Sequence, residues 1–428
     1  MKQMLVKAAR KVLPGGTTKG LEELYRKGRV RLVRTYYGNP GKGLKILALT
    51  GTNGKTTTTN YLNEILKEAG YRTAMFSTAE IEVAGKRKLN DLNATVPTTA
   101  QVMNFLRQAK RAKVDYVVLE VTSHALQQHK LGGLKPIMAV MTNLTQDHLD
   151  YFKTMENYAA AKGMLFSGEP WFIVLNRDDK WFEYFNQFDA EELKITYGQD
   201  KAAGVRIDSF KLYKKGTEAK LKMDGKKLDV ATSLTGEFNA YNMAAAAAAA
   251  SLLGIDGEVI AEGIANLETL PGRFERAVTD EPYEVIVDYA HTPDAIERLL
   301  KSAKEVTKGR VVLVFGATGD RDKGKRPTMG EIAAREADVI FVTDEENYTE
   351  PADQIRTAVL EGIEQAGGMG KTEEVPDRHE AIKKALEQAK KDDMILITGM
   401  GHEVYRITDG KRIPWNDGDV VREILGKK

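Results

Sequence analysis

A short segment of the sequence has the residues of a phosphate-binding loop. Residues 50–56 read TGTNGKT and lie between the apolar run 44–49 and a helical pattern. Glycines let backbone N–H groups approach phosphate oxygens, and the start of a helix adds positive potential. Lys55 is expected to reach the β- and γ-phosphates of a nucleotide, and the Thr56 hydroxyl to ligate Mg²⁺. The strict G-x-x-x-x-G-K-[ST] pattern is not met, because Leu49 stands in place of its first glycine.

Three ionisable residues further along the chain are candidates for the same site. Glu120 lies near the end of the apolar run 116–121, at the edge of a sheet where α/β ligand sites form. His148 comes later, and Lys162 lies four residues after Tyr158 on one helix face. Each has an ordinary alternative: a solvated glutamate, a hydrogen-bonded core histidine and a solvated lysine. The alternative for the loop is a tight turn without a ligand.

The elements that must position these residues are alternating strands and helices. Apolar runs at 44–49, 116–121 and 139–143 predict buried parallel strands, whereas short alternating runs in 193–235 favour antiparallel ones. Seven consecutive alanines, 244–250, indicate a closely packed helix. After Pro271-Gly272, strands are expected again at 284–287, 311–315, 339–342 and 394–397.

The predicted fold class is therefore α/β, with two catalytic domains. A central P-loop domain at 44–272 has a mostly parallel sheet with an antiparallel subsheet. A Rossmann-like α/β domain follows at 273–428. A short arm, 1–43, precedes both. This agrees with the two or three domains that 428 residues suggest at roughly 150 residues each.

Composition excludes several kinds of site. The chain has no cysteine, which excludes disulfides, thiolate metal sites, iron–sulfur clusters and cysteine nucleophiles. No apolar stretch approaches the roughly 18–20 residues of a membrane span, and no secretory signal is visible. We therefore expect a cytoplasmic protein.

Charge is unevenly spread, although the net charge is only +2. Residues 1–43 contain eleven Lys and Arg but two Glu, a net charge of +9, which leaves −7 for the rest. A basic arm before a mildly acidic body argues against a general polyanion binder, so nucleic acid is not an expected partner. The arm is predicted to hold a helix that Pro14-Gly15-Gly16 ends, a second helix near 19–28, a strand at 30–33 and a linker at 39–43.

Several segments resemble the Mur ligase superfamily, the ATP-dependent amide-bond ligases of bacterial cell-wall precursors, and most of all its MurE branch. They follow the family's order: 50–57 (TGTNGKTT), 120–126 (EVTSHAL), 142–151 (TNLTQDHLDY), 158–162 (YAAAK), 236–242 (GEFNAYN), 288–294 (DYAHTPD), 319–327 (GDRDKGKRP) and 399–403 (GMGHE). The resemblance covers residues 44–428. It implies addition of an amino acid to a carboxylate of a cell-wall peptide precursor through an acyl phosphate, with release of ADP and phosphate.

The same resemblance assigns roles by position. Its catalytic residues are Lys55, Glu120, His148 and Lys162. It implies two Mg²⁺ ions held by Thr56, Glu120, His148 and a CO₂-derived carbamate on Lys162. ATP is expected to contact Gly51, Thr52, Asn53, Gly54, Lys55, Thr56, Thr57, Asn239, Asn242, Arg273, Asp288 and His291. Acceptor contacts are Thr98, Thr122, Ser123, Gln128 and Lys130. Contacts to the incoming amino acid are Arg321, Asn347, Tyr348, Gly399 and Glu403.

Departures from the family pattern concern both substrates. About 44 residues precede the loop, fewer than the family's uridine-nucleotide domain needs, so a changed acceptor is expected. The arm is then expected to contact a pyrophosphate or anionic lipid, or to pack on the body. Tyr348 stands where enzymes that use diaminopimelate have an arginine. Glu345 and Glu346 precede it, which favours a cationic side chain such as lysine or ornithine, and Glu403 is a candidate for its ammonium.

Three functions remain in competition at this point. The first is a MurE-like ligase that takes a nucleotide- or lipid-linked muropeptide and an amino acid, as a monomer. The second is a superfamily ligase with a non-UDP acceptor of the folylpolyglutamate, cyanophycin or other peptide-polymer type. The third is a non-catalytic nucleotide-binding scaffold, which the presence of Lys55, Thr56, Glu120, His148 and Lys162 opposes.

Overall fold

The arm is helical where the structure describes it. The computed structural model describes residues 15–90 and 97–427, and α2 (Gly15–Tyr36) includes the predicted helix near 19–28. The predicted strand at 30–33 is wrong, because these residues continue α2. Val30 is buried and Val33 packs against the same body, and this three-residue spacing places both on one helix face. Gly15 and Gly16 are helical too, and the helix predicted before Pro14 lies outside the described residues.

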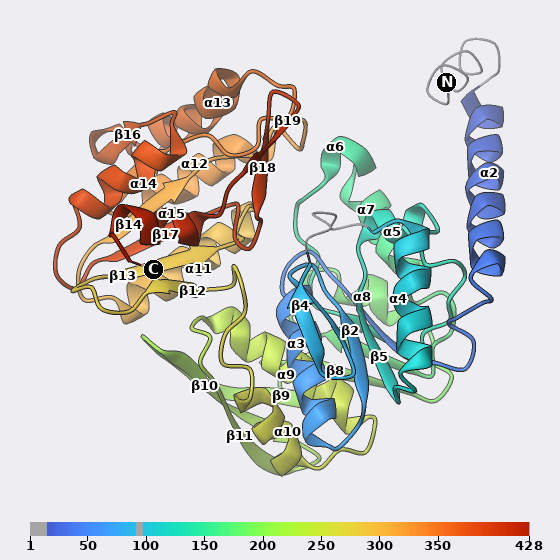
Figure 1. The fold of residues 1–428 in the computed structure, drawn as a ribbon. Coiled ribbons are helices and arrows are strands. Elements are labelled where there is room, and N and C mark those ends of the chain that lie inside the picture. The colour runs from blue at the N-terminus through green and yellow to red at the C-terminus, as the bar shows by residue number, and fades with distance from the viewer. Residues whose placement is uncertain (1–14, 91–96, 428) are drawn as a thin grey trace.

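Eleven strands form one large sheet in the order β11-β10-β9-β8-β7-β6-β1-β5-β2-β3-β4 (Figure 1). Their bounds are β1 (Lys45–Thr50), β2 (Thr73–Phe76), β3 (Glu80–Val83), β4 (Lys86–Leu89), β5 (Tyr116–Glu120), β6 (Met138–Met141), β7 (Phe172–Asn176), β8 (Leu193–Gly198), β9 (Val205–Tyr213), β10 (Gly216–Met223) and β11 (Lys226–Thr232). The strands from β9 to β2 in that order are parallel. The predicted antiparallel subsheet is confirmed for β9–β11, whereas β8 pairs in parallel.

Helices cover both faces of this sheet. Along β1, Leu47 and Leu49 join one buried cluster, and Ile46 and Ala48 join the other. The first cluster lies under α3 (Lys55–Glu68), α9 (Glu237–Ser251) and α10 (Gly257–Ala265). The second lies under α4 (Thr99–Arg111), α5 (Ser123–Gln127), α7 (Met155–Gly163) and α8 (Phe182–Asn186), beside the short α6 (Leu149–Phe152).

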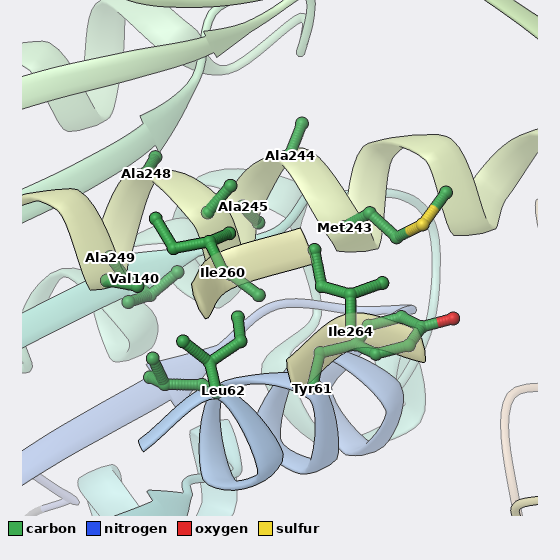
Figure 2. Close-up of a cluster of buried hydrophobic side chains, with 14 of the residues drawn as sticks. Tyr61, Leu62, Val140, Met243, Ala244, Ala245, Ala248, Ala249, Ile260 and Ile264 are labelled. Carbon is green, nitrogen blue, oxygen red and sulfur yellow. The ribbon is translucent and has the colours of Figure 1, made fainter. Parts of the chain in front are cut away.

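The alanine run is a tightly packed helix, as predicted. All seven alanines of 244–250 are fully buried in α9. In Figure 2, Ala245 and Ala249 lie on the side of α9 that faces Ile260 of α10 and Leu62 of α3, whereas Ala244 and Ala248 point to its other side. Close approach continues at Gly263 of α10, where a Cβ would overlap the backbone of Ile65 in α3. Small side chains therefore let three helices lie close together behind the phosphate loop.

A second, six-stranded sheet has the order β12-β13-β17-β14-β15-β16 and is parallel except at the β12–β13 edge. Its strands are β12 (Glu275–Val278), β13 (Glu284–Asp288), β14 (Val311–Phe315), β15 (Val339–Val342), β16 (Thr372–Glu374) and β17 (Met394–Thr398). One face carries α11 (Pro293–Val306), α12 (Lys325–Glu336) and α13 (Ala352–Gln365). The other carries α14 (Arg378–Glu387) and α15 (Asp417–Ile424), and a hairpin of β18 (Tyr405–Thr408) and β19 (Lys411–Pro414) lies apart.

The two sheets confirm the predicted α/β class and its two successive units. The chain passes from one to the other near Gly272, whose φ is +64. A Cβ at this glycine would overlap the backbone of Gly401 and His402, so the crossing is packed against the second unit. No helix within 15–90 and 97–427 is both long and apolar enough to cross a membrane.

Candidate active site

A cleft of about 740 Å³ opens between the two sheets. Its walls include the residues that follow β1, β5 and β6 in the first sheet and β13, β15 and β17 in the second. These are carboxyl ends of parallel strands, where α/β proteins bind ligands. The predicted residues that line the cleft are Gly51, Thr52, Asn53, Gly54, Lys55, Thr56, Thr57, Glu120, Thr122, Ser123, His148, Lys162, Asn239, Asn242, Arg273, Asp288, His291, Arg321, Tyr348, Gly399 and Glu403.

The phosphate loop is held by the segment that follows β6. Gly54 has φ +81 at the start of α3, a left-handed conformation that favours glycine, and a Cβ there would overlap the Asn242 side chain. The Asn53 N–H donates to Asn143 Oδ1 at 2.9 Å, and the Thr142 hydroxyl donates to the Asn53 carbonyl at 2.6 Å. No side chain caps the first turn of α3. Its N–H groups are therefore suited to an anion.

Two lysine amines donate to carbonyls of this loop. Lys55 Nζ lies 2.8 Å from the Thr52 carbonyl, and Lys162 Nζ lies 2.6 Å from the Gly51 carbonyl. Lys162 is fully buried in α7, with its amine 4.7 Å from the centre of the Tyr158 ring. Burial lowers the pKa of Lys162 well below its ordinary value, and Lys55 lowers it further. Burial and the charge of Lys55 thus both disfavour the protonated form of the Lys162 amine.

Oxygen atoms gather where α3 begins. Thr56 Oγ1 lies 3.0 Å from Glu120 Oε2, and Arg273 Nη2 donates to the same hydroxyl at 3.2 Å. Thr78 fixes Glu120 through its N–H and its hydroxyl, each 2.7 Å from a carboxylate oxygen. Among the described residues, no group of three or more His, Cys, Asp or Glu side chains is arranged to hold a metal ion on its own. A sparse oxygen set fits Mg²⁺, which keeps positions for phosphates and water.

His148 stands at the start of α6 with φ +56, next to a buried charge pair. Burial lowers its pKa to about 3, although Asp147, 3.2 Å away, opposes this. A neutral imidazole keeps a nitrogen lone pair for a ligand. Asp147 itself accepts from Lys325 Nζ of α12 at 3.3 Å. Burial raises the pKa of Asp147, but Lys325 and the neighbouring histidines hold it well below its ordinary range.

Sequence reasoning did not name several residues that join the two units. Lys325 on Asp147 is one such contact, and Asn53 Nδ2 donates to Asp294 Oδ2 of α11 at 2.9 Å in another. All three missed residues lie inside segments already quoted, 142–151, 288–294 and 319–327. Motif membership was therefore the available signal, but sequence does not show which motif residues face one another.

Four further predicted residues make hydrogen bonds within the protein. Asn242 Nδ2 donates to Asn239 Oδ1 at 3.2 Å on α9. The Asp288 carboxylate accepts from the N–H groups of Phe274 and Ala290 at 2.7 and 2.8 Å, which ties the crossing segment to β13. The His291 Nδ1 atom lies 2.7 Å from the Tyr289 carbonyl. Each also borders the cleft.

On the second unit's side, aromatic and acidic side chains line the cleft. The Arg321 guanidinium lies 5.0 Å from the centre of the Tyr348 ring. The Tyr348 hydroxyl donates to Glu346 Oε2 at 3.0 Å, and Tyr348 has φ +52. The Tyr289 hydroxyl donates to Glu403 Oε1 at 3.3 Å. Tyr289 was not among the predicted contacts, and Glu346 was named only for its charge.

Four predicted residues lie outside the described lining of this cleft: Thr98, Gln128, Lys130 and Asn347. The Thr98 hydroxyl caps α4 instead. Asn347 Nδ2 donates to the Glu350 carbonyl at 3.0 Å and to Asp409 Oδ1 at 2.8 Å, which anchors the turn of the β18–β19 hairpin. The substrate contacts expected of these four residues stay predictions.

Comparison with known proteins covers most of the chain. Residues 49–250 match the family model of the Mur ligase middle domain. Residues 272–401 match that of the Mur ligase glutamate ligase domain. The chain is 37% identical over 420 residues to UDP-N-acetylmuramoyl-L-alanyl-D-glutamate–2,6-diaminopimelate ligase 1 of Clostridium acetobutylicum, covering 97% of this chain and 85% of the relative. The corresponding ligase of Geobacillus kaustophilus is 38% identical over 411 residues, 94% of this chain and 83% of that one.

Solved structures agree in fold. A UDP-N-acetylmuramoyl-L-alanyl-D-glutamate–2,6-diaminopimelate ligase has TM-score 0.62 and 33% identity, over 90% of this chain and 79% of that one. A folylpolyglutamate synthase of Mycobacterium tuberculosis, complexed with ADP and AMPPCP, has TM-score 0.72 but 18% identity, over 94% and 96%. The second likeness concerns the fold alone.

Proposed function

Because the chain belongs to the Mur ligase family, we propose that it joins an amino acid to the carboxylate of a UDP-linked muramoyl peptide. It is an ATP-dependent acid–amino-acid ligase of peptidoglycan synthesis. The main support for this acceptor and its site is that a single cleft is lined by the phosphate loop of one unit and by acidic and aromatic residues of the other. We propose that residues 44–272 form the ATP-binding domain and residues 273–428 the amino-acid-binding domain.

The proposed reaction has two steps. The acceptor carboxylate attacks the γ-phosphorus of ATP, giving an acyl phosphate and ADP. The amino group of the incoming amino acid then attacks the acyl carbon, and inorganic phosphate leaves. The chain positions these groups and neutralises charge through Lys55 and Arg273, which border the loop. Asn242 on α9 lies beside Gly54 and donates to Asn239, and both are proposed for the nucleotide.

We propose that Thr56, Glu120 and His148 hold Mg²⁺. Bound Mg²⁺ supplies charge neutralisation at the phosphates. The hydroxyl and carboxylate oxygens are 3.0 Å apart and already oriented by Thr78 and Arg273, which supports this assignment. The neutral state of His148 at ordinary pH leaves it able to donate a lone pair.

We further propose that Lys162 reacts with CO₂. Only a neutral amine attacks CO₂, and the burial that lowers the pKa of Lys162 favours that form. The amine forms an N–C bond and loses a proton, which gives a carbamate anion beside the loop. The positive charge of Lys55 would attract a carbamate anion on Lys162, whereas it repels an ammonium there.

Other parts of the proposal concern the acceptor. Thr122 and Ser123 border the cleft after β5 and are proposed to contact the peptide. A non-UDP acceptor remains the alternative. Contact of the basic arm with a membrane, a monomeric state and a cytoplasmic location stay predictions.

The test is release of phosphate from ATP by the full chain with a matrix of acceptors and amino acids. We expect release that requires UDP-linked muramoyl-dipeptide together with an amino acid, with the tripeptide seen by mass spectrometry. Release only with folate-, peptide- or lipid-linked acceptors would replace the proposed acceptor. Tight ATP binding without release for any pair would favour the scaffold.

A further inference from the structure

We propose that the outer face of α2, together with the neighbouring α4, binds an anionic lipid surface. Residues 26–36 of α2 contain five Lys and Arg and no acid, and the two acids of the arm, Glu22 and Glu23, come before them. α4 packs against α2 and adds three basic residues, again without an acid. Two adjacent helices thus form one basic surface, which is separate from the proposed ligase site.

One side of α2 is fixed to the first unit, and the other side is exposed. Val30 is buried, and Arg34 Nη1 donates to the Gly132 carbonyl at 2.9 Å. Leu32 is 74% exposed and Tyr36 85% exposed. Their spacing of four residues makes them neighbours on the helix surface. A helix that is held on its inner side therefore presents an apolar pair on its outer side.

Exposed cations lie next to this apolar pair. Arg29 and Arg31 are exposed on α2, and Lys110 and Arg111 are exposed at the end of α4. Arg29 precedes Leu32 by three residues, so helix geometry places their side chains side by side. At a bilayer interface, leucine and tyrosine side chains enter the boundary between headgroups and acyl chains, while guanidinium groups pair with lipid phosphates. The outer face of α2 has both kinds of side chain.

The position of α2 leaves the cleft accessible. In Figure 1, α2 lies on the side of the first unit that is away from the second unit. The described lining of the cleft includes no residue of α2 or α4. Residues 44–428 carry a net charge of −7, so an anionic surface attracts the arm and repels the rest of the chain. A nucleic acid would also pair with the cations, but it offers no apolar layer for Leu32, whereas a bilayer does.

The test is sedimentation of the full chain with vesicles of phosphatidylcholine alone or with added phosphatidylglycerol. We expect the anionic vesicles to bind the chain at least about 10-fold more tightly than the neutral ones, and added salt to weaken this binding. Equal binding to both kinds of vesicle, or binding to neither, would overturn the proposal. The measurement does not use phosphate release, so its failure would leave the proposed ligase reaction intact.

Two double variants separate the charged part of the surface from its apolar part. Arg29→Gln/Arg31→Gln and Leu32→Ser/Tyr36→Ser should each weaken binding to the anionic vesicles by about 10-fold or more. All four side chains are exposed, so both variants should keep the unaltered rate of phosphate release in solution. Unchanged vesicle binding in either variant would overturn the proposal.

Matched controls remove the same groups elsewhere. Lys226→Gln/Lys227→Gln, at exposed residues of β11, removes two charges, and Leu193→Ser, on β8, removes a side chain that is 55% exposed. Both should bind the vesicles within about twofold of the unaltered chain. Equal weakening in these controls would show a surface without a defined site. An RNA oligonucleotide that displaces the chain from the vesicles at equal phosphate concentration would show that the arm binds polyanions by charge alone, and would also overturn the proposal.

Discussion

The two walls of the cleft are built in different ways. In the first unit, one contiguous segment after β1 supplies the loop, its glycine turn and Lys55, and neighbouring carbonyls hold the lysine amines. In the second unit, Arg321, Tyr348 and Glu403 come from three separate loops, and the β18–β19 hairpin holds one of them. The phosphate loop itself is thus one contiguous segment, although Asn143 and Lys162 hold it from a distance, whereas the wall proposed for the amino acid is assembled from separate loops.

This difference has a consequence for how each wall changes. A contiguous loop tolerates few substitutions, since backbone geometry and side chain act together at Gly54 and Lys55. In a wall assembled from separate loops, one substitution, for example at Tyr348 or Glu346, can change the charge without disturbing the sheet behind it. We therefore propose that the reaction type and the choice of amino acid depend on separable parts of this chain.

The largest effect is expected from the first wall. Lys162→Ala should lower phosphate release by about a thousandfold, because it removes the proposed anion next to the loop. Decarbonated buffer should lower the activity of the unaltered chain, and added bicarbonate should restore it. Lys211→Ala, at an exposed residue of β9, is the control and should keep full activity. Full activity of Lys162→Ala would remove the carbamate from the proposal.

Arg273→Lys tests whether activity requires a guanidinium at position 273, where the chain crosses between the two units. The lysine keeps the charge but loses the Nη2 hydrogen bond to Thr56 and the stacking 4.8 Å from the Tyr289 ring centre. We expect kcat/KM for ATP to fall by about 10- to 100-fold. Arg335→Lys, at an exposed residue of α12, should behave as the unaltered chain. An unchanged value would show that charge alone suffices there.

Asn347→Ala tests whether the second wall depends on its hairpin. The substitution leaves Asp409 and the Glu350 carbonyl without a donor and should lower the free energy of unfolding by about 1–3 kcal/mol. The KM for the amino acid should rise while that for ATP stays unchanged. Asn266→Ala, on the surface of α10's C-cap, should cost less than about 0.5 kcal/mol. Equal increases in both KM values would contradict a separable second wall.

The smallest effect concerns His402, which packs against Gly272 at the crossing. Burial and Arg273 lower its pKa to about 3, against 6.5 for an ordinary histidine. Between these values the unfolded chain binds the extra proton, so His402 makes stability fall as the pH drops from 6.5 towards 3. In denaturant titrations, His402→Gln should reduce the loss between pH 6.5 and 5.5 by about 1 kcal/mol. A parallel pH profile for both proteins would contradict a His402 that stays neutral in the folded chain.

Local patterns were enough for much of the fold. The strand at Val311–Phe315 has its predicted bounds, and the alanine run forms the expected packed helix, since periodicity and burial coincide there. The prediction of a strand at 30–33 was wrong because Val30 and Val33 can occupy the buried face of a strand or of a helix. Packing of α2 against α4 and its neighbours decided for helix.

The phosphate loop and the family could be predicted from consecutive residues alone, because such motifs are short and contiguous. The contacts of Lys325 with Asp147, of Asn53 with Asp294, and of Asn347 with the hairpin required the folded structure. The residues of each pair lie 178, 241 and 62 positions apart. No local preference encodes such contacts, since they form only when separate helices and loops pack together around two sheets.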